Sequence, residues 1–210
     1  MLKIDFHVHT YYSKCAVSSP KEVIKFAIKR GLGGIAITDH NTGKGFEKTR
    51  SIKTKLLVIP GVEVKSTHGD IIALGVAERF PAVKSPEETI EYIRDLGGVS
   101  LIPHPFDYLR SGIGYILDKL KPDLIEVYNS NMLTPLGNFL ASKYAAKMSC
   151  GATAGSDAHI MGEVGYAYSF VDDGNIADII SSICKNRKPY YGRPTPLHWS
   201  FLRKIRARLR

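Results

Sequence analysis

The segment Gly34–His40, with the sequence GIAITDH, is a short apolar run that ends in a carboxylate and an imidazole. Its β-branched residues predict a buried strand, and the polar pair follows at the point where that strand ends. The same arrangement occurs in Ile4–His9 (IDFHVH), Val99–His104 (VSLIPH) and Ala152–His159 (ATAGSDAH). Apolar strands that end in metal-ligand residues therefore recur along the chain, and they bear on both the fold and the site.

Helical segments separate these strands. Ser19-Pro20 and Ser85-Pro86 each combine an N-cap residue with proline at the first helical position, and they predict helices that run to about Arg30 and Leu96. Further strands are expected at 56–64, 70–76, 123–127 and 166–171, and further helices at 113–120, 136–147 and 176–186. Roughly seven strands thus alternate with helices, which is the pattern of an α/β fold with parallel strands.

Periodicity alone does not distinguish an open doubly wound sheet from a closed barrel. The polar residues do, because in a barrel the carboxyl ends of all strands converge on one face, where active sites lie. In an open sheet, strands at opposite edges would keep some of these residues far apart. We therefore expect an α/β barrel whose polar residues share one rim.

Composition indicates a single globular unit. The chain has 210 residues, of which 44% are hydrophobic and 23% charged, and it has neither an apolar run long enough to span a bilayer nor a secretory leader at its start. A cytoplasmic protein without a transmembrane segment is expected. Cys15, Cys150 and Cys184 are scattered without CxxC spacing, so any metal should be held mainly by histidines and carboxylates.

The net charge of +9 is concentrated near one end of the chain. Residues 193–210 contain six basic and no acidic residues, and removing them leaves a net charge of +3. Thr195-Pro196 would cap a basic amphipathic helix with an apolar residue at every fourth position (Leu197, Phe201, Ile205 and Leu209). We expect a barrel over 1–192 and this tail helix over 193–210, which either docks on the barrel or contacts nucleic acid or anionic lipid.

Each polar motif is ambiguous by itself. His7 and His9 alternate along a strand and can meet one ion, but they could also be hydrogen-bonded core residues. Glu63 lies between two valines, where a carboxylate needs a cation or hydrogen bonds, and Lys65 is an alternative partner. His104 stands between two prolines that stiffen its backbone. Their joint occurrence on one predicted rim favours a site for more than one metal ion.

The same residues carry a family resemblance. The motifs are H7-x-H-T-x-Y-S13, I37-T-D-H-N41, G61-V-E63, P103-H-P105, I125-E-V-Y-N129 and G155-S-D-A-H159. In this order they resemble the PHP superfamily, the polymerase and histidinol phosphatase phosphoesterases, over residues 1–192. The resemblance implies a distorted (β/α)7 TIM-like barrel in which two or three divalent ions hydrolyse phosphate esters.

By position in those motifs, the resemblance implies three metal sites. The first would be held by His7, His9, Glu63 and Asp157. Glu63 would bridge to a second site with His104, and a third ion would lie between His40 and His159. Mixed imidazole and carboxylate ligands favour zinc, manganese or iron. If no third ion is bound, His159 or His40 can donate a proton to the leaving group.

The chain departs from the family pattern in the loop after the first strand. Relatives usually place an Asp or His where this chain has Lys14 and Cys15; an ammonium has no lone pair to donate, whereas a thiolate can ligate. A weak third site is therefore expected. A family histidine is also missing near the fourth strand, where Asp70 or His68 could replace it.

Other polar residues are candidates for supporting or substrate-binding roles. Asp39 could support a ligating imidazole, and Glu126 and Asn129 could brace ligands or touch the substrate. Lys14, Lys65 or Arg110 could hold a non-reacting phosphate, although the ordinary expectation for each of them is a place on the solvated surface.

The sequence is compatible with three functions. The first is a phosphomonoesterase that acts on a small phosphorylated metabolite or nucleotide. The second is a nuclease or a nucleic-acid-associated PHP module that uses residues 193–210. The third, a non-enzymatic protein similar to the barrel subunit of archaeal ribonuclease P, is disfavoured because that family lacks the metal-binding residues present here.

Overall fold

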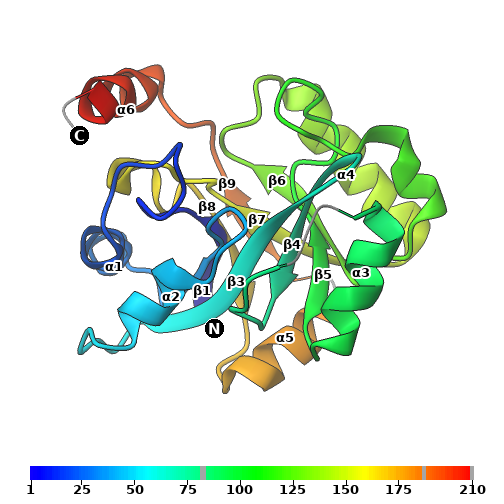
Figure 1. Ribbon diagram of the computed structural model, residues 1–210, viewed down its shortest axis with the longest axis horizontal. Helices are drawn as coiled ribbons and strands as arrows, with labels where there is room; N and C mark the ends of the chain where they lie inside the picture. Colours follow the sequence, from blue (N-terminus) through cyan, green and yellow to red (C-terminus); the bar gives the residue numbers. More distant parts are fainter. Residues whose placement is uncertain (81–83, 186–187, 209–210) are drawn as a thin grey trace.

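The computed structural model describes residues 1–80, 84–185 and 188–208. Nine strands form one sheet in the order β7-β6-β5-β4-β3-β2-β1-β8-β9, and Figure 1 shows this sheet curled into a nearly closed barrel. The strands are β1 (Leu2–Val8), β2 (Gly34–Ile37), β3 (Leu57–Ser66), β4 (Gly69–Leu74), β5 (Val99–Ile102), β6 (Leu124–Asn129), β7 (Gly151–Gly155), β8 (Ala167–Val171) and β9 (Tyr190–Gly192). The predicted α/β barrel is confirmed.

Helices cover the outside of the barrel. The α-helices are α1 (Pro20–Lys29), α2 (Lys44–Thr49), α3 (Pro86–Asp95), α4 (Pro135–Met148), α5 (Ile176–Lys185) and α6 (Leu197–Arg208). Two 3-10 helices, η1 (Gly114–Lys119) and η2 (Met161–Glu163), complete the set. The helix expected at 113–120 is thus a 3-10 helix, α2 was not predicted, and the predicted end of α5 at Asn186 lies outside the described residues.

The strand directions differ from the expected parallel succession. β1, β2 and β3 are parallel to one another, as are β5, β6 and β7, but β4 runs antiparallel to both β3 and β5. The cause is the turn at Thr67 and His68, where the Ser66 hydroxyl donates to the Gly69 carbonyl at 2.6 Å. Such a tight connection permits only a hairpin, because parallel strands need a long crossover.

Both predicted capping sequences start helices as expected. The Ser19 hydroxyl accepts a hydrogen bond from the Glu22 amide while the Glu22 carboxylate accepts one from the Ser19 amide, and Ser85 and Glu88 form the same pair. Helix α1 then buries one apolar face against β1 and β2 in a cluster that includes Val8, Val23, Ile24, Ala27, Ile35 and Ile37. This packing holds the first two strands, and the polar residues at their ends, in place.

The barrel closes next to the polar rim. The Asp157 amide donates to the His7 carbonyl at 2.8 Å, and the His9 amide donates to the Ala158 carbonyl at 2.9 Å. These bonds join the end of β1 to the loop after β7 through a parallel bridge between Val8 and Ala158. The first and last motifs of the chain therefore lie side by side.

Helix α6 docks on the barrel. Trp199 packs on Gly162, where a Cβ atom would lie 2.2 Å from the indole ring, and its Nε1 donates to the Tyr166 hydroxyl at 3.3 Å. Arg206 pairs with Glu22 of α1. The apolar residues expected to mark the contact face, Leu197, Phe201 and Ile205, are instead exposed, and Leu209 lies outside the described residues.

None of the helices in the described part of the chain is long and apolar enough to cross a membrane.

Asp5 is a buried carboxylate that ties three segments together. Its oxygens accept backbone hydrogen bonds from His7 at 3.3 Å, Ser156 at 2.8 Å and Gly165 at 2.9 Å. Burial raises the pKa of Asp5 to about 6, although these hydrogen bonds act in the opposite direction. The side chain thus anchors β1 to the segments on both sides of η2.

We predict that Asp5→Ala lowers the free energy of unfolding by about 2–4 kcal/mol, because three buried N–H groups lose their acceptor. Urea unfolding at pH 8 measures this difference. Asp95→Ala, which removes an exposed carboxylate at the end of α3, is the control and should change stability by less than about 0.5 kcal/mol. Equal effects of the two substitutions would show that Asp5 has no anchoring role.

Candidate metal centre

Seven side chains from separate strand ends converge on one rim of the barrel. They are His7, His9, His40, Glu63, His104, Asp157 and His159, the residues expected to bind metal. All are buried except His40, whose side chain is one-third exposed. The convergence follows from the fold: the residues from β1, β2, β5 and β7 lie at or just beyond the carboxyl ends of these strands, and Glu63 projects from within β3.

His7, His9 and Asp157 form the most compact group. The two Nε2 atoms are 3.0 Å apart, and they lie 3.5 Å and 3.4 Å from the Asp157 Oδ1 atom. Glu63 completes the group, with its oxygens 3.5 Å from His7 and 3.3 Å from His9. Three ligand atoms thus lie within 3.5 Å of one another, and the Glu63 carboxylate lies beside both histidines.

The His9 ring is oriented by a chain of hydrogen bonds. The Ser13 hydroxyl donates to Asp39 at 2.6 Å, since a carboxylate can only accept. Its oxygen therefore accepts from the His40 amide at 2.9 Å and from His9 Nδ1 at 3.2 Å. With its proton on Nδ1, His9 presents an Nε2 lone pair to the centre. Asp39 thus supports His9 through Ser13 and is itself held by Thr10.

Glu126 performs the same task for His7. Its Oε1 accepts from His7 Nδ1 at 3.2 Å, while Oε2 accepts from the His104 amide at 2.8 Å and from Asn129 Nδ2 at 2.9 Å. Gly155 makes room for this contact, since a Cβ atom there would lie 2.5 Å from Glu126 Oε1. The carboxylate therefore braces two of the converging histidines.

His159 is braced by backbone. Its Nδ1 donates to the Asp157 carbonyl at 2.8 Å, which leaves Nε2 as a lone-pair donor. Burial and the nearby His9 lower the pKa of His159 to about 3. An imidazole that is neutral at pH 7 suits a metal ligand better than a proton donor.

Glu63 lies between His104 on one side and His40 on the other. Its Oε1 atom is 3.2 Å from His104 Nε2, and its Oε2 atom is 3.1 Å from His40 Nδ1. Burial opposes ionisation of Glu63, but His7 and His104 hold its pKa well below the usual range. Glu63, Asp70 and His104 can also form a metal-binding group, with ligand atoms that all lie within 4.8 Å of one another.

The electrostatics of the rim favour a cation. Burial lowers the pKa of His7, but Asp157, Glu126 and Glu63 together raise it well above its ordinary value. Burial and the charge of Glu63 raise the pKa of Asp70 to about 6. A positive charge at the centre would reduce the repulsion between the carboxylates. It would also reduce the repulsion between the imidazole lone pairs that point at one another.

The dimensions of the His7, His9 and Asp157 group fit a metal ion. The three ligand atoms form a triangle with sides of 3.0 to 3.5 Å, which matches one face of a tetrahedron whose corners lie about 2.0 Å from its centre, the length of a zinc–nitrogen bond. The donor set of imidazoles and carboxylates suits the same ions. The backbone is also strained here, as His104 and Asp157 have φ angles of 30° and 54°.

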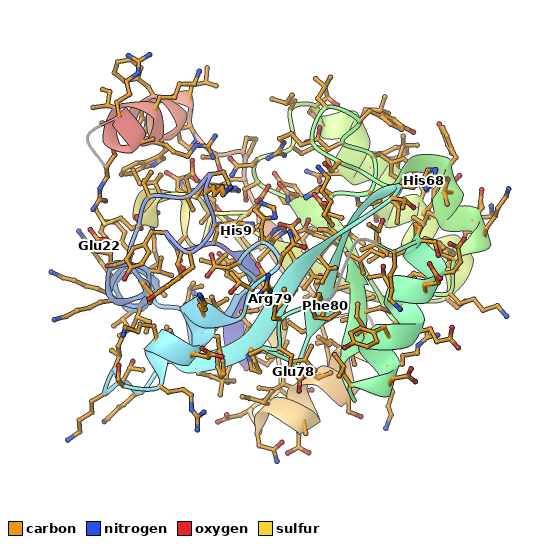
Figure 2. All side chains as sticks on the ribbon, viewed as in Figure 1. His9, Glu22, His68, Glu78, Arg79 and Phe80 are labelled. Atoms are coloured by element: carbon orange, nitrogen blue, oxygen red, sulfur yellow. The ribbon has the colours of Figure 1, made fainter. Side chains whose placement is uncertain are left out.

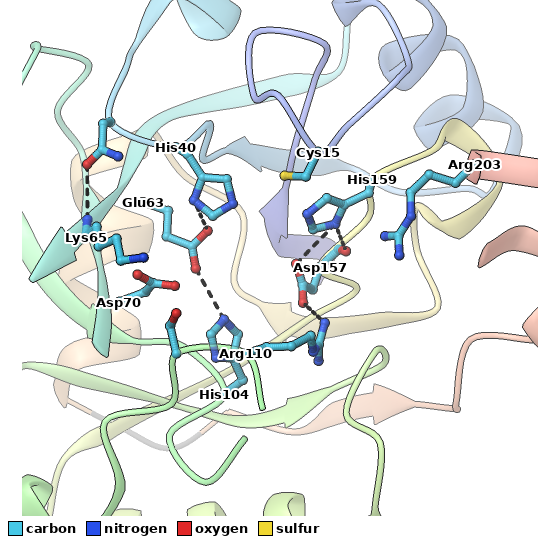
Figure 3. A pocket seen from close by; sticks show the side chains of 12 residues that line it. Cys15, His40, Glu63, Lys65, Asp70, His104, Arg110, Asp157, His159 and Arg203 are labelled. Atoms are coloured by element: carbon cyan, nitrogen blue, oxygen red, sulfur yellow. Dashed lines mark hydrogen bonds and ion pairs between the residues drawn. The ribbon is translucent and has the colours of Figure 1, made fainter. Parts of the chain in front are cut away.

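A cavity of about 500 Å³ opens above these residues. Figure 3 shows Lys65, Arg110 and Arg203 around it together with Cys15 and the converging side chains. Arg110 is held by Asp107 at 2.7 Å, by Asp157 Oδ2 at 2.9 Å and by the Asn131 carbonyl at 2.7 Å. Cationic side chains over a metal-binding floor suit an anionic ligand.

The third predicted site gains His9, which forms a possible metal-binding group with His40 and His159. Cys15 lines the cavity next to His40. Burial lowers the pKa of His40, but a hydrogen bond with the Cys15 thiol and the charge of Glu63 raise it above its ordinary value.

Two predicted candidates lie elsewhere. Lys14 is exposed and does not line the cavity. His68 is exposed and lies at the outer end of the β3–β4 hairpin, as Figure 2 shows. Its ring forms a hydrogen bond with the Thr67 hydroxyl. Asp70, two residues later, is the one that reaches the rim.

Sequence reasoning missed two residues of the rim. Ser13 belongs to the first motif but had no role assigned, and only the structure reveals that it links Asp39 to His9. Arg203 was assigned to a basic tail, because its approach to the cavity depends on the docking of α6.

Comparisons with known proteins agree with this architecture. The family model described as PHP-associated matches residues 135–187. Two uncharacterised proteins of Methanocaldococcus jannaschii are similar in sequence. One is 36% identical over 141 residues, which cover 61% of this chain and 82% of that protein. The other is 33% identical over 183 residues, which cover 83% of this chain and 73% of that protein.

Solved structures match at lower identity. A two-domain protein from Bacteroides vulgatus that contains a predicted PHP-like metal-dependent phosphoesterase has a TM-score of 0.69 at 17% identity, over 91% of this chain and 65% of that one. PsfC from Pseudomonas syringae matches with a TM-score of 0.73 at 16% identity, over 99% and 98% of the two chains. Endonuclease Q, in complex with an abasic duplex, matches with a TM-score of 0.62 at 16% identity, over 87% and 56%. The chain is thus similar to PHP-domain proteins: residues 135–187 match the PHP-associated model, and the barrel has the fold of structures described as PHP-like.

Proposed function

We propose that the protein is a metal-dependent phosphoesterase that hydrolyses the phosphate ester of a small metabolite or nucleotide. The observation that carries the proposal is the position of Glu63. Its Oε1 atom faces His7 and His104, and its Oε2 atom faces His9 and His40. A carboxylate with imidazoles at both oxygens is suited to bridge two cations.

The residues divide among the ions as follows. His7, His9 and Asp157 would hold one ion with Glu63, and His104 and Asp70 would hold a second with the same carboxylate. A third, weaker position would use His40 and His159, with the Cys15 thiolate as a further candidate ligand. Bound zinc, manganese or iron would acidify a water molecule and neutralise charge on the phosphate oxygens.

The remaining groups would act on the substrate. Lys65 lines the cavity and would attract the phosphate, while Arg110, paired with Asp107 and Asp157, would hold Asp157 in place. His40 is partly exposed to the cavity and has a raised pKa, which suits a proton donor to the leaving alkoxide. His159, with its pKa near 3, would serve as a ligand.

The cavity supports a small substrate, since about 500 Å³ is within the range of small-molecule sites. The second candidate activity is nucleic-acid cleavage, which the likeness to endonuclease Q favours. A panel of a chromogenic phosphomonoester, nucleotides and an oligonucleotide, each with zinc, manganese and iron, tests the two activities against each other.

We predict that the protein binds at least two divalent ions per chain and that chelation abolishes hydrolysis of the phosphomonoester, because the bridging carboxylate needs cations on both sides. Elemental analysis after supplementation with manganese or zinc gives the number of ions. One ion or none per chain would contradict the bridging role of Glu63.

Glu63→Gln should reduce hydrolysis by more than about 100-fold, whereas Glu126→Gln should reduce it by about 10- to 100-fold, the usual loss for a group that only orients ligands. The two substitutions are isosteric and both sites are buried, so the comparison is matched. Activity is measured at saturating metal. A larger loss in the Glu126 variant would indicate that Glu126 bridges the ions and that Glu63 only orients ligands.

Cys15→Ser should weaken the third ion and leave the first two in place, because the thiol lies beside His40 and away from the His7, His9 and Asp157 group. Metal content is measured after dialysis against graded free zinc. Cys150→Ser, at a half-buried position whose thiol bonds to the Pro122 carbonyl, is the control. An undiminished third ion in the Cys15 variant would exclude the thiol as its ligand.

A further inference from the structure

Arg203 brings helix α6 into the candidate site. It lines the same cavity as His40, Asp157 and His159, although it lies more than forty residues beyond the last of them in sequence. Figure 3 shows it on the His159 side of the cavity, with Lys65 on the opposite side, near Glu63. Its charge contributes to the low pKa of His159, after burial and His9.

The Arg203 guanidinium has no carboxylate partner within the described part of the chain. The charge of Arg203 acts on Glu163, a buried residue whose Oε2 accepts from the His159 amide at 2.7 Å, and among the described residues the two form no ion pair. The neighbouring arginines differ. Arg206, one turn away, pairs with Glu22, and Arg110 is held by two carboxylates.

The position of Arg203 is set by the docking of α6. Trp199 precedes it by one helical turn and packs on Gly162, so α6 is held against the segment that follows His159. Arg206 follows it by nearly one turn and is held on α1. Because contacts on both sides fix the helix, Arg203 is presented to the cavity with no carboxylate partner among the residues that the structure describes.

We propose that Arg203 determines substrate specificity by binding a second anionic group of the substrate, away from the phosphate that is hydrolysed. This inference rests on the proposed phosphoesterase function. The carboxylates at the metal centre are paired with imidazoles, and Arg110 is paired with two carboxylates. Arg203, in contrast, is available to form a bidentate pair with a phosphate or carboxylate of a ligand. The favoured substrate is thus a small phosphate ester that carries one further negative group.

The test compares three esters of similar size: phenyl phosphate, carboxyphenyl phosphate and phenylene bisphosphate. Each is used with the metal-loaded wild type and with Arg203→Met. The quantity measured is the KM of each doubly anionic ester relative to the KM of phenyl phosphate. Comparing this ratio between variants cancels differences in leaving-group ability, and the two doubly anionic esters separate recognition of a carboxylate from recognition of a phosphate.

We expect the wild type to prefer at least one doubly anionic ester, and Arg203→Met to reduce that preference by about 10- to 100-fold, the value of a charged hydrogen-bonded pair. Arg203→Lys should restore part of the preference, because it keeps the charge but loses the bidentate geometry. Lys204→Met, an exposed charge on the same helix, is the matched control and should keep the full preference.

Two outcomes would overturn the inference: a wild type that shows no preference for either doubly anionic ester, or an Arg203→Met variant that folds and retains the preference. Calorimetric binding of phenyl phosphate and phenylene bisphosphate is measured in parallel. If no ester is hydrolysed with any metal, the phosphoesterase function fails, and the calorimetric ratio still decides the role of Arg203. If the esters are hydrolysed but Arg203→Met changes neither the KM ratio nor the calorimetric affinity ratio, only the specificity proposal is contradicted.

Discussion

One buried carboxylate surrounded by four imidazoles is the interaction on which this site depends. Glu63 has His7 and His104 at one oxygen and His9 and His40 at the other, at 3.1 to 3.5 Å. These histidines come from three different parts of the barrel, so the arrangement exists only when the strands are in register. The shape of the barrel, its closure at Asp157 and the supporting hydrogen bonds can all be understood as means of keeping these groups together.

Local signals predicted much of the fold. The capping boxes at Ser19 and Ser85 start α1 and α3 where the sequence indicated, and apolar runs marked most strands. The sequence could not predict strand direction, because an apolar run has the same pattern in a parallel and in an antiparallel strand. In the case of β4, a two-residue turn decided it. The sequence also did not predict which face of α6 contacts the barrel. That contact depends on Gly162, which only the folded barrel places against Trp199.

The site was predictable where strand ends carry the ligands and unpredictable where tertiary structure brings residues together. Asp70 and His68 were equivalent alternatives in the sequence, but the turn exposes His68 and the start of β4 carries Asp70 to the rim. Because β4 is antiparallel, it is the beginning of the strand that faces the site. Arg203 gave no signal of its own, since a basic residue on a helix is most often solvated.

The hydrogen bonds to the Nδ1 atoms of His7, His9 and His159 have a thermodynamic consequence. A carboxylate, a hydroxyl and a backbone carbonyl hold the three rings, each in one tautomer and one orientation. The side-chain rotational entropy that ligands ordinarily lose on coordination has therefore been lost already during folding. Uptake of an ion then requires dehydration of the ion but little rearrangement of the protein, and the rings should keep the same rotamers with and without it.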